Sequence, residues 1–348
     1  MTKIWGFEFF LATQDVSGKD LVDYFDFYVD LWVRAEELGY DGVLLSEHHF
    51  GGGYSPSPNL LIPMIAKRTK DLRLGVMGMV APYHNAWRLA EEAGMLDVIT
   101  NGRFEFGTSA GIPSEFAKIG LEPAEARARY EEALEIIDAA MKEPVISYHG
   151  KYWNFDDMPI VPRPVQEDMP RWTTVISEGS ARKAAARGSK LATGFIPTAQ
   201  VKQVFDAYNE AAAEAGQPTG PDCLALRRQI LLDVGDDPDA AEHAAQFSQG
   251  FRNMLENNDW RVRKTKGEAL DAPSGAHGYE LGNDEFIAGK PAEVAEQILD
   301  QCNESGAGHF QVVFAGAHTP AAVARAWEVF GKEVIPLVKQ GANATVAA

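Results

Sequence analysis

The sequence predicts one (β/α)8 barrel domain that spans residues 1–348. Short apolar strands alternate with helical segments along the chain, and a glycine ends several of the helices just before the next strand. No G-x-G-x-x-G motif opens a helix after the first strand, which would be typical of a doubly wound dinucleotide-binding sheet. The barrel is therefore the favoured fold class, and the doubly wound open sheet is the alternative.

The same helix-to-strand junction recurs four times. It lies at Gly39-Tyr40-Asp41-Gly42, Asn101-Gly102, Arg187-Gly188 and Ser305-Gly306-Ala307-Gly308. Glycine readily adopts the left-handed conformation that ends a helix, and each of these junctions leads into a short apolar run. The pattern is typical of parallel βα units.

Strands and helices are predicted in alternation over most of the chain. The predicted strands lie near 4–10, 42–46, 72–77, 103–107, 171–176, 191–194, 224–234 and 309–315. The predicted helices lie near 20–37, 58–69, 85–98, 124–142, 179–187, 198–215, 238–256, 291–304 and 320–338.

Two insertions interrupt the alternation. Residues 144–170 contain two strand-like runs around His149-Gly150-Lys151 and a proline-rich stretch, which predicts a β-hairpin after the helix at 124–142. Residues 257–290 are polar and contain several glycines, which predicts a long loop before the eighth strand. We expect this loop to be a mobile lid that shields the active site from water.

Charge and cysteine content exclude several classes of protein. The chain has 32 basic and 50 acidic residues, a formal net charge of -18, so nucleic-acid and membrane-surface binding are disfavoured. Two cysteines cannot form a disulfide framework or a four-thiolate metal site. The N-terminus shows no signal peptide and no apolar run is long enough to cross a membrane, so we expect a cytoplasmic protein.

The carboxyl ends of the barrel strands are where an active site is expected. The densest chemical cluster there is Glu47-His48-His49-Phe50, after the second strand. It can be interpreted as an acid–base group, a metal site or a structural contact. No H-E-x-x-H pattern is present, so no metal is expected, and we favour an imidazole that exchanges protons beside a cofactor.

Two loops of small residues also follow strands. Ser177-Glu178-Gly179-Ser180 precedes a predicted helix, whose first N–H groups and positive dipole end favour an anion. Ser180 has a simpler interpretation as the N-cap of that helix. Gly107-Thr108-Ser109-Ala110-Gly111 is the second loop, and together the two indicate a phosphorylated cofactor.

Several segments, taken in order, resemble the bacterial luciferase-like flavin monooxygenase family over nearly the whole chain. They are Glu47-His48-His49-Phe50, Leu74-Gly75-Val76, Ala81-Pro82-Tyr83-His84-Asn85, Arg88-Leu89-Ala90-Glu91-Glu92, Leu96-Asp97, Gly102-Arg103-Phe104-Glu105-Phe106-Gly107 and Gly289-Lys290-Pro291-Ala292-Glu293-Val294. The resemblance implies a TIM barrel that takes reduced FMN from a separate, transiently bound reductase. It also implies a reaction with O₂ through a flavin hydroperoxide that oxidises a small organic substrate.

The resemblance also assigns roles to particular residues. His48 matches the catalytic histidine beside the flavin ring, and Glu47 matches the carboxylate before it. Met77-Gly78 matches a bulge that supports the ring, often through a cis peptide bond. The remaining cofactor-binding positions that we expect are Ser109, Glu178, Gly179, Ser180 and Arg182.

One departure affects the expected phosphate site. Where bacterial luciferase has a cysteine and then a phosphate-binding arginine, this chain has Ser109-Ala110. Light emission is therefore not expected, and the phosphate must be held by backbone N–H groups, Ser180 or another cation such as Arg182.

The substrate, the cofactor and the oligomeric state are open to alternatives. An apolar substrate pocket is expected around Phe7, Phe195 and Phe314. A deazaflavin-dependent oxidoreductase of the same fold and a non-catalytic flavin-binding partner subunit are the alternatives to the FMN monooxygenase. A homodimer is expected through the helices at 58–69 and 85–98, which carry Leu60, Leu61, Met64, Trp87, Leu89 and Met95.

Overall fold

The computed structural model describes residues 2–10, 18–50, 54–194, 196–235, 284, 286–315 and 319–346. The chain divides into two compact units. Unit 1 contains Met1–Phe7, Gly18–Gly42 and Val175–Ala348, and unit 2 contains Glu8–Ser17 and Val43–Thr174. The expectation of a single domain over residues 1–348 stays a prediction.

Parallel strands and their crossover helices make up most of unit 2. Its strands are β2 (Gly42–Leu45, from Val43 onward), β3 (Arg73–Val80), β4 (Phe104–Ser109) and β7 (Arg171–Thr174). Its helices are α2 (Ile62–Ala66), α3 (Ala86–Thr100), α4 (Pro113–Ile119) and α5 (Pro123–Lys142). β3 pairs with β4 in parallel, and β4 pairs with β7 in parallel. Buried leucine, valine and phenylalanine side chains along these strands form the core of the unit.

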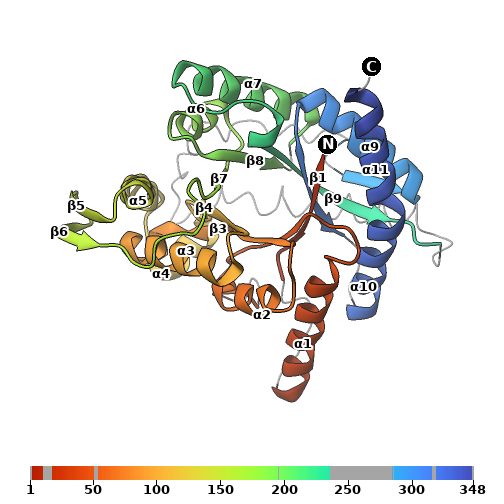
Figure 1. Cartoon of the computed structure of the whole chain (residues 1–348), viewed down its shortest axis with the longest axis horizontal. Helices are drawn as coiled ribbons and strands as arrows, with labels where there is room; N and C mark the ends of the chain where they lie inside the picture. Colours follow the sequence, from red (N-terminus) through yellow and green to blue (C-terminus); the bar gives the residue numbers. More distant parts are fainter. Residues whose placement is uncertain are drawn as a thin grey trace, which may run out of the picture. The chain divides into compact units, whose positions relative to one another are not determined.

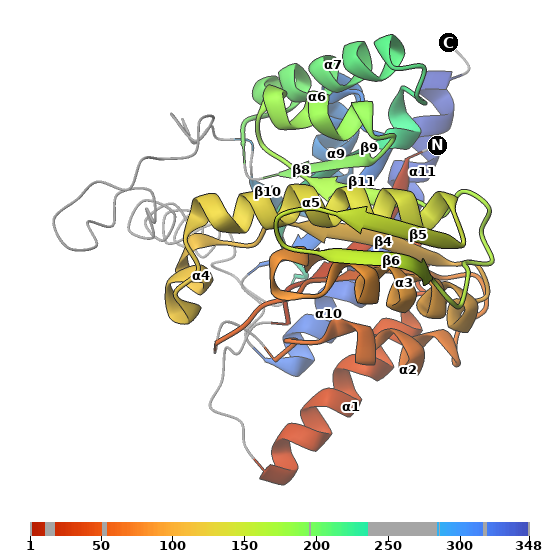
Figure 2. The same cartoon turned by 90° about the vertical axis from the view of Figure 1, so that its left-hand side faces the viewer.

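The predicted hairpin insertion is present in unit 2. β5 (Val145–His149) and β6 (Asn154–Pro159) pair antiparallel, and Figure 2 shows them alongside α5. The Tyr148 hydroxyl donates to Glu135 Oε2 of α5 at 2.7 Å, and the Lys151 amide donates to Glu132 Oε1 at 2.6 Å. The hairpin is thus fastened to α5 through two acidic side chains.

Unit 1 also consists of parallel strands with helices against them (Figure 1). Its strands are β1 (Lys3–Glu8, up to Phe7), β8 (Lys190–Gly194), β9 (Leu224–Leu232), β10 (Phe286–Gly289) and β11 (His309–Phe314). Its helices are α1 (Gly18–Arg34), α6 (Glu178–Ala186), α7 (Thr198–Glu214), α9 (Pro291–Ser305), α10 (Pro320–Val329) and α11 (Ile335–Val346). β9 pairs in parallel with β8, β10 and β11, and β11 pairs in parallel with β1.

The strand order confirms the predicted fold class. The sheet runs β10-β9-β11-β1-β2-β3-β4-β7-β8, and an additional pairing of β9 with β8 closes it. A closed parallel sheet whose strands are connected through helices is a (β/α)8 barrel. β10 is an extra strand beside β9.

Most predicted elements match the observed ones, with four differences. The helix expected at 58–69 is a short 3-10 turn at Pro58–Leu60 followed by α2. α4 was not expected, although Pro113 stands at its first turn and Gly120 ends it in the left-handed conformation. β10 occupies part of the segment 257–290 that was expected to be a loop. The helix expected at 320–338 is divided into α10 and α11 by a wider turn at Phe330–Val334. The predicted helix 238–256 and residues 257–283 of the predicted lid lie outside the described residues.

Candidate active site

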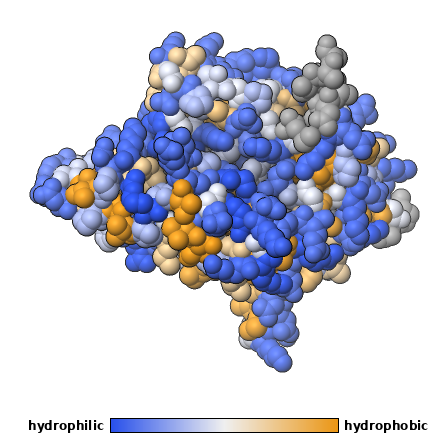
Figure 3. Space-filling view, in the orientation of Figure 1, coloured by the Kyte–Doolittle hydropathy of each residue, from blue (hydrophilic) through white to orange (hydrophobic). Residues whose placement is uncertain are grey.

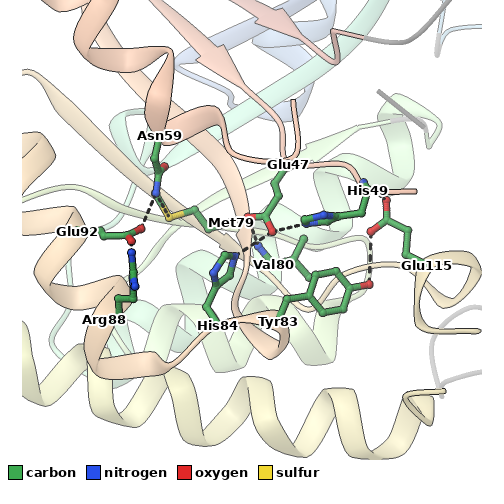
Figure 4. Close-up of polar contacts among 10 residues, drawn as sticks. All are labelled: Glu47, His49, Asn59, Met79, Val80, Tyr83, His84, Arg88, Glu92 and Glu115. Atoms are coloured by element: carbon green, nitrogen blue, oxygen red, sulfur yellow. Dashed lines mark hydrogen bonds and ion pairs between the residues drawn. The ribbon is translucent and has the colours of Figure 1, made fainter. Parts of the chain in front are cut away.

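Glu47 lies just after β2 in unit 2 and is 4% exposed. Its Oε1 accepts hydrogen bonds from Nε2 of His49 at 2.7 Å and Nε2 of His84 at 2.9 Å (Figure 4). Its Oε2 accepts a bond from the Val80 amide at the end of β3, at 3.0 Å. One buried carboxylate therefore ties the ends of two neighbouring strands to two imidazole rings.

These contacts decide the charge of Glu47. Burial acts to raise the pKa of Glu47, but the hydrogen bonds from His49 and His84 and the Val80 amide lower it to about 2. The same hydrogen bond to Glu47 raises the pKa of His49. Glu47 is consequently an anion at neutral pH, and both imidazoles donate to it.

His48 has a different carboxylate partner. Its Nδ1 lies 3.3 Å from Glu115 Oε1 on α4, and the Phe9 ring lies 5.7 Å from its ring. Glu115 also accepts bonds from the His49 amide at 3.0 Å and from the Tyr83 hydroxyl at 3.4 Å. Glu115 was not predicted as a site residue, and it is the group that orients the expected catalytic histidine.

The charge of Glu115 fixes the tautomer of His48. Burial acts to raise the pKa of Glu115, whereas the hydrogen bonds from His48 and the His49 amide outweigh it and lower that pKa. An ionised carboxylate can only accept, so Nδ1 of His48 carries the proton that points at it. Nε2 is then the ring atom through which His48 can take or give a proton.

The other expected residues of unit 2 lie within β3 and at the end of β4. The peptide bond between Met77 and Gly78 is cis, as the resemblance implied. A Cβ on Gly78 would lie 2.6 Å from the backbone carbon of Thr108, so this close approach of two strands requires glycine. Ser109 is half-buried at the end of β4 and pairs in register with Val80.

In unit 1, α6 begins at Glu178, close to the start of the helix that was expected at 179–187. Ser177, not Ser180, is the N-cap, and its hydroxyl oxygen accepts from the Ser180 amide at 3.4 Å. The interpretation of Ser180 as the N-cap is therefore wrong. Glu178 and Gly179 are exposed, and nothing lies within 4 Å of a Cβ placed on Gly179.

Arg182 is exposed on α6 and forms an ion pair with another helix. Its Nη2 lies 2.6 Å from Glu210 Oε2 of α7, which packs beside α6 in Figure 1. The expectation that Arg182 holds the phosphate stays a prediction. For this role, the guanidinium would have to leave Glu210 and bind the phosphate instead.

The aromatic residues expected around the substrate are separated by the structure. Phe7 is buried and stacks against the Arg227 guanidinium, whose central carbon lies 3.7 Å from the centre of the ring. Phe314 packs against Trp327, which belongs to α10, and against Phe330, which follows α10. Its side chain therefore lies on the side of β11 that faces this helix. Phe195 lies outside the described residues.

Within the described ranges, no group of three or more His, Cys, Asp or Glu side chains is arranged to hold a metal ion. None of the described helices is long and apolar enough to cross a membrane.

The contacts of Glu47 predict an acid dependence of stability. A folded-state pKa near 2, below the ordinary 4.5, stabilises the protein above pH 4.5, and this contribution is lost as the pH falls toward 2. We expect the difference in unfolding free energy between wild type and Glu47→Gln to change by about 2 kcal/mol from pH 6 to pH 3. His49 adds little in this range, because a histidine with a raised pKa is protonated in both states there.

Urea unfolding at several pH values measures this difference. The exposed Glu143→Gln is the matched control and should show no such change with pH. A constant difference between wild type and Glu47→Gln over this range would show that the pKa of Glu47 is the same in the folded and unfolded chains, and so that its contacts do not stabilise the charge.

A closed parallel barrel with a histidine–carboxylate cluster at its strand ends defines a (β/α)8-barrel enzyme. Over residues 7–309 the chain matches the family described as luciferase-like monooxygenase. The chain belongs to this family and is an oxidoreductase of the monooxygenase type.

Two relatives are similar to this chain over most of its length. The chain is 33% identical to the protein y4wF of Sinorhizobium fredii, over 82% of this chain and 85% of that protein. It is 26% identical to the oxygenase component of the flavin-dependent trigonelline monooxygenase of Acinetobacter baylyi, over 71% of this chain and 72% of the relative.

Two solved structures share the fold but are named for different cofactors. The oxygenating constituent of 3,6-diketocamphane monooxygenase from Pseudomonas putida, in complex with FMN, is similar with a TM-score of 0.74 and 22% identity, over 97% of this chain and 99% of that one. An F420-dependent secondary alcohol dehydrogenase is similar with a TM-score of 0.72 and 18% identity, also over 97% and 99%.

Proposed function

We propose that this enzyme uses reduced FMN and O₂ to oxygenate a small organic substrate. The observation that carries the proposal is the pairing of His48 with Glu115 at the strand ends of a chain that belongs to the luciferase-like monooxygenases. A fixed imidazole with one nitrogen left for proton exchange is what an oxygenation at neutral pH requires of the protein.

The residues that we expect to hold FMN suit the parts of that molecule. Helix α6 begins with N–H groups that have no partner within the helix, and Gly179 leaves room above them for a phosphate. We assign Glu178, Gly179, Ser180 and Arg182 to the phosphate and ribityl chain. Met77, Gly78 and Ser109 are assigned to the flavin ring. When bound, reduced FMN supplies the electrons that activate O₂.

The protein's own groups orient and move protons. Nε2 of His48 exchanges the proton, and Glu115 holds Nδ1 so that the ring stays in one tautomer and one orientation. Glu47 keeps His49 and His84 in place and thereby fixes the end of β3 beside them. We therefore regard Glu47 as a positioning residue for the cluster rather than a group that reacts.

A separate reductase would deliver the reduced flavin. The support is that the trigonelline relative is named as an oxygenase component, which implies a second component for that system. A deazaflavin-dependent oxidoreductase of the same fold is the alternative, since one of the similar structures uses that cofactor. A non-catalytic partner subunit is disfavoured, because such a subunit has no need for an oriented His48.

Oxygen incorporation tests the proposal. The enzyme is mixed with photoreduced FMN, ¹⁸O₂ and a panel of aldehydes, ketones and terpenes, and the products are analysed by mass spectrometry. We expect at least one compound to gain one ¹⁸O atom. Oxidation of the reduced deazaflavin with reduction of a ketone, and no labelled product with FMN, would favour the alternative.

We also propose a homodimer through the helices on one face of unit 2. Three of the residues expected at that interface are exposed, with Leu60 at 72%, Met95 at 54% and Met64 at 46%, whereas Leu61 and Leu89 are buried in the core. Figure 3 shows apolar atoms gathered where Figure 1 places α3. An apolar surface of this kind is typical of a protein interface.

Substitution of the exposed apolar residues tests the dimer. We expect a Leu60→Asp, Met95→Asp double variant to be a monomer by light scattering at micromolar concentration, with wild-type helix content. The control is Val22→Asp on α1, which is 57% exposed and should leave the dimer intact. A monomeric wild-type chain would contradict the proposal.

A further inference from the structure

The side chains of two neighbouring arginines, Arg227 and Arg228, point to opposite faces of β9. Arg228 points toward the helices, where its Nε donates to Gln301 of α9 at 2.7 Å and its Nη2 to Thr198 of α7 at 3.0 Å. Arg227 points to the other face, because successive side chains of a strand alternate. Its Nε donates to Gln311 Oε1 of β11 at 2.9 Å, and its guanidinium lies over the Phe7 ring.

Arg227 is a buried, charged residue, and one nitrogen of its guanidinium forms no hydrogen bond with the described residues. The residue is 6% exposed, and within the described chain its Nη2 has no hydrogen-bond partner. None of the ion pairs among the described residues includes it, and burial lowers the pKa of Arg227 to about 9, which leaves it charged at neutral pH. A buried cation that has no counter-ion among the described residues destabilises the fold, and a bound anion would offset this cost.

A second unused group lies next to it. Gln229 is 7% exposed, and its Oε1 is also buried without a partner in the described structure. Residues two apart on a strand share one face, with Cα atoms about 6.6 Å apart. The inner face of β9 thus presents an N–H donor with a positive charge and, beside it, an oxygen that can only accept.

The strand next to β9 makes room for this side chain. Gly194 of β8 is in register with Arg227, and a Cβ at Gly194 would lie 2.7 Å from the Arg227 Cβ. Any larger residue at Gly194 would displace the arginine. The position of the Arg227 side chain therefore depends on β9, which carries it, and on a glycine in the adjacent strand β8.

We propose that Arg227 and Gln229 form a subsite for an organic anion that carries a hydroxyl or N–H group beside its carboxylate. Nη2 of Arg227 binds a carboxylate oxygen, and Oε1 of Gln229 accepts from the adjacent O–H or N–H. Phe7 and the aliphatic part of the arginine then flank the apolar part of the molecule. The substrate class rests on the proposed function, whereas binding of the anion does not.

Binding to the flavin-free protein tests the subsite. Calorimetric titration uses mandelate, which has both groups, phenylacetate, which has only the charge, and mandelamide, which is neutral. We expect affinity to fall in that order. Arg227→Met should weaken mandelate and phenylacetate at least ~10-fold, and Gln229→Leu should reduce mandelate to the affinity of phenylacetate.

Stability separates a binding role from a structural one. We expect Arg227→Met to melt close to the wild-type temperature, because the removal of a buried charge with no ion-pair partner among the described residues offsets the hydrogen bond that Gln311 loses. Arg228→Met is the matched control on the same strand and should lower the melting temperature, because it leaves Gln301 and Thr198 without their partner.

Several outcomes would overturn the subsite. They are a melting temperature for Arg227→Met that falls as far as that of Arg228→Met, equal affinity for phenylacetate and mandelamide, and binding of phosphate or chloride as tight as that of mandelate. Loss of the preference for FMN over riboflavin in Arg227→Met would show that the arginine holds the cofactor phosphate instead. Failure to bind reduced FMN would contradict the proposed function and leave the anion titrations valid.

Discussion

His48→Ala is expected to lower the yield of oxygenated product by ~100-fold or more while FMN affinity stays within a few-fold of wild type. Nε2 of His48 is the atom that we expect to exchange the proton, and alanine removes it without changing Glu47 or its hydrogen-bond partners. Oxygen should then leave as hydrogen peroxide, so the ratio of peroxide to product rises.

The measurement compares product, peroxide and oxygen uptake in the same reaction. His149→Ala is the matched control, because His149 lies on the exposed hairpin and pairs only with Asp156 among the contacts described for it. Wild-type product yield in His48→Ala would contradict the assignment of this histidine.

Glu115→Ala is expected to have the second-largest effect, a fall of ~10- to 100-fold in product yield. The change removes the acceptor of His48 Nδ1 and of the His49 amide, so the ring loses its fixed tautomer. Glu115→Gln keeps an acceptor oxygen but not the charge, and we expect an intermediate yield.

A purely structural role for Glu115 would give a different result. Thermal unfolding is measured for both variants, and product yield is compared at a temperature where each is folded. If the folded variants retain the wild-type ratio of product to peroxide, Glu115 does not act through His48. The Glu143→Gln variant on the surface supplies the control for a lost carboxylate.

Much of the fold could be predicted because its signals are local. Glycine ends helices before apolar strands at residues such as Gly39 and Gly306, and both adopt positive φ angles in the structure. These signals located the barrel strands to within a few residues. α4 was missed because it is short, although Pro113 and Gly120 mark its two ends.

The cluster around His48 could be predicted only in part. Adjacent residues of the chain mark Glu47, His48 and His49 as a group, but not which carboxylate each imidazole contacts. Glu115 lies 67 residues from His48 and His84 lies 37 residues from Glu47, so both contacts depend on the tertiary fold. His84 and Tyr83 stand in one of the family-like segments, which was a signal for their importance.

The role proposed for Arg227 could not be predicted from the sequence either. Charged residues within an apolar strand are a visible irregularity of Leu224–Leu232, and such a residue in a buried strand indicates a specific contact. The sequence does not distinguish Arg227 from Arg228. The observed strand places Arg228 against the helices and Arg227 on the other face, where its Nη2 has no partner among the described residues.

Cofactor binding under anaerobic conditions tests the central claim most directly. Photoreduced FMN and the reduced deazaflavin F420 are each titrated into the flavin-free protein, and the two dissociation constants are compared. We expect reduced FMN to bind at least ~10-fold more tightly, and Gly179→Asp, which places a negative charge at the start of α6, to weaken it. Tighter binding of the deazaflavin, with no binding of reduced FMN, would contradict the account.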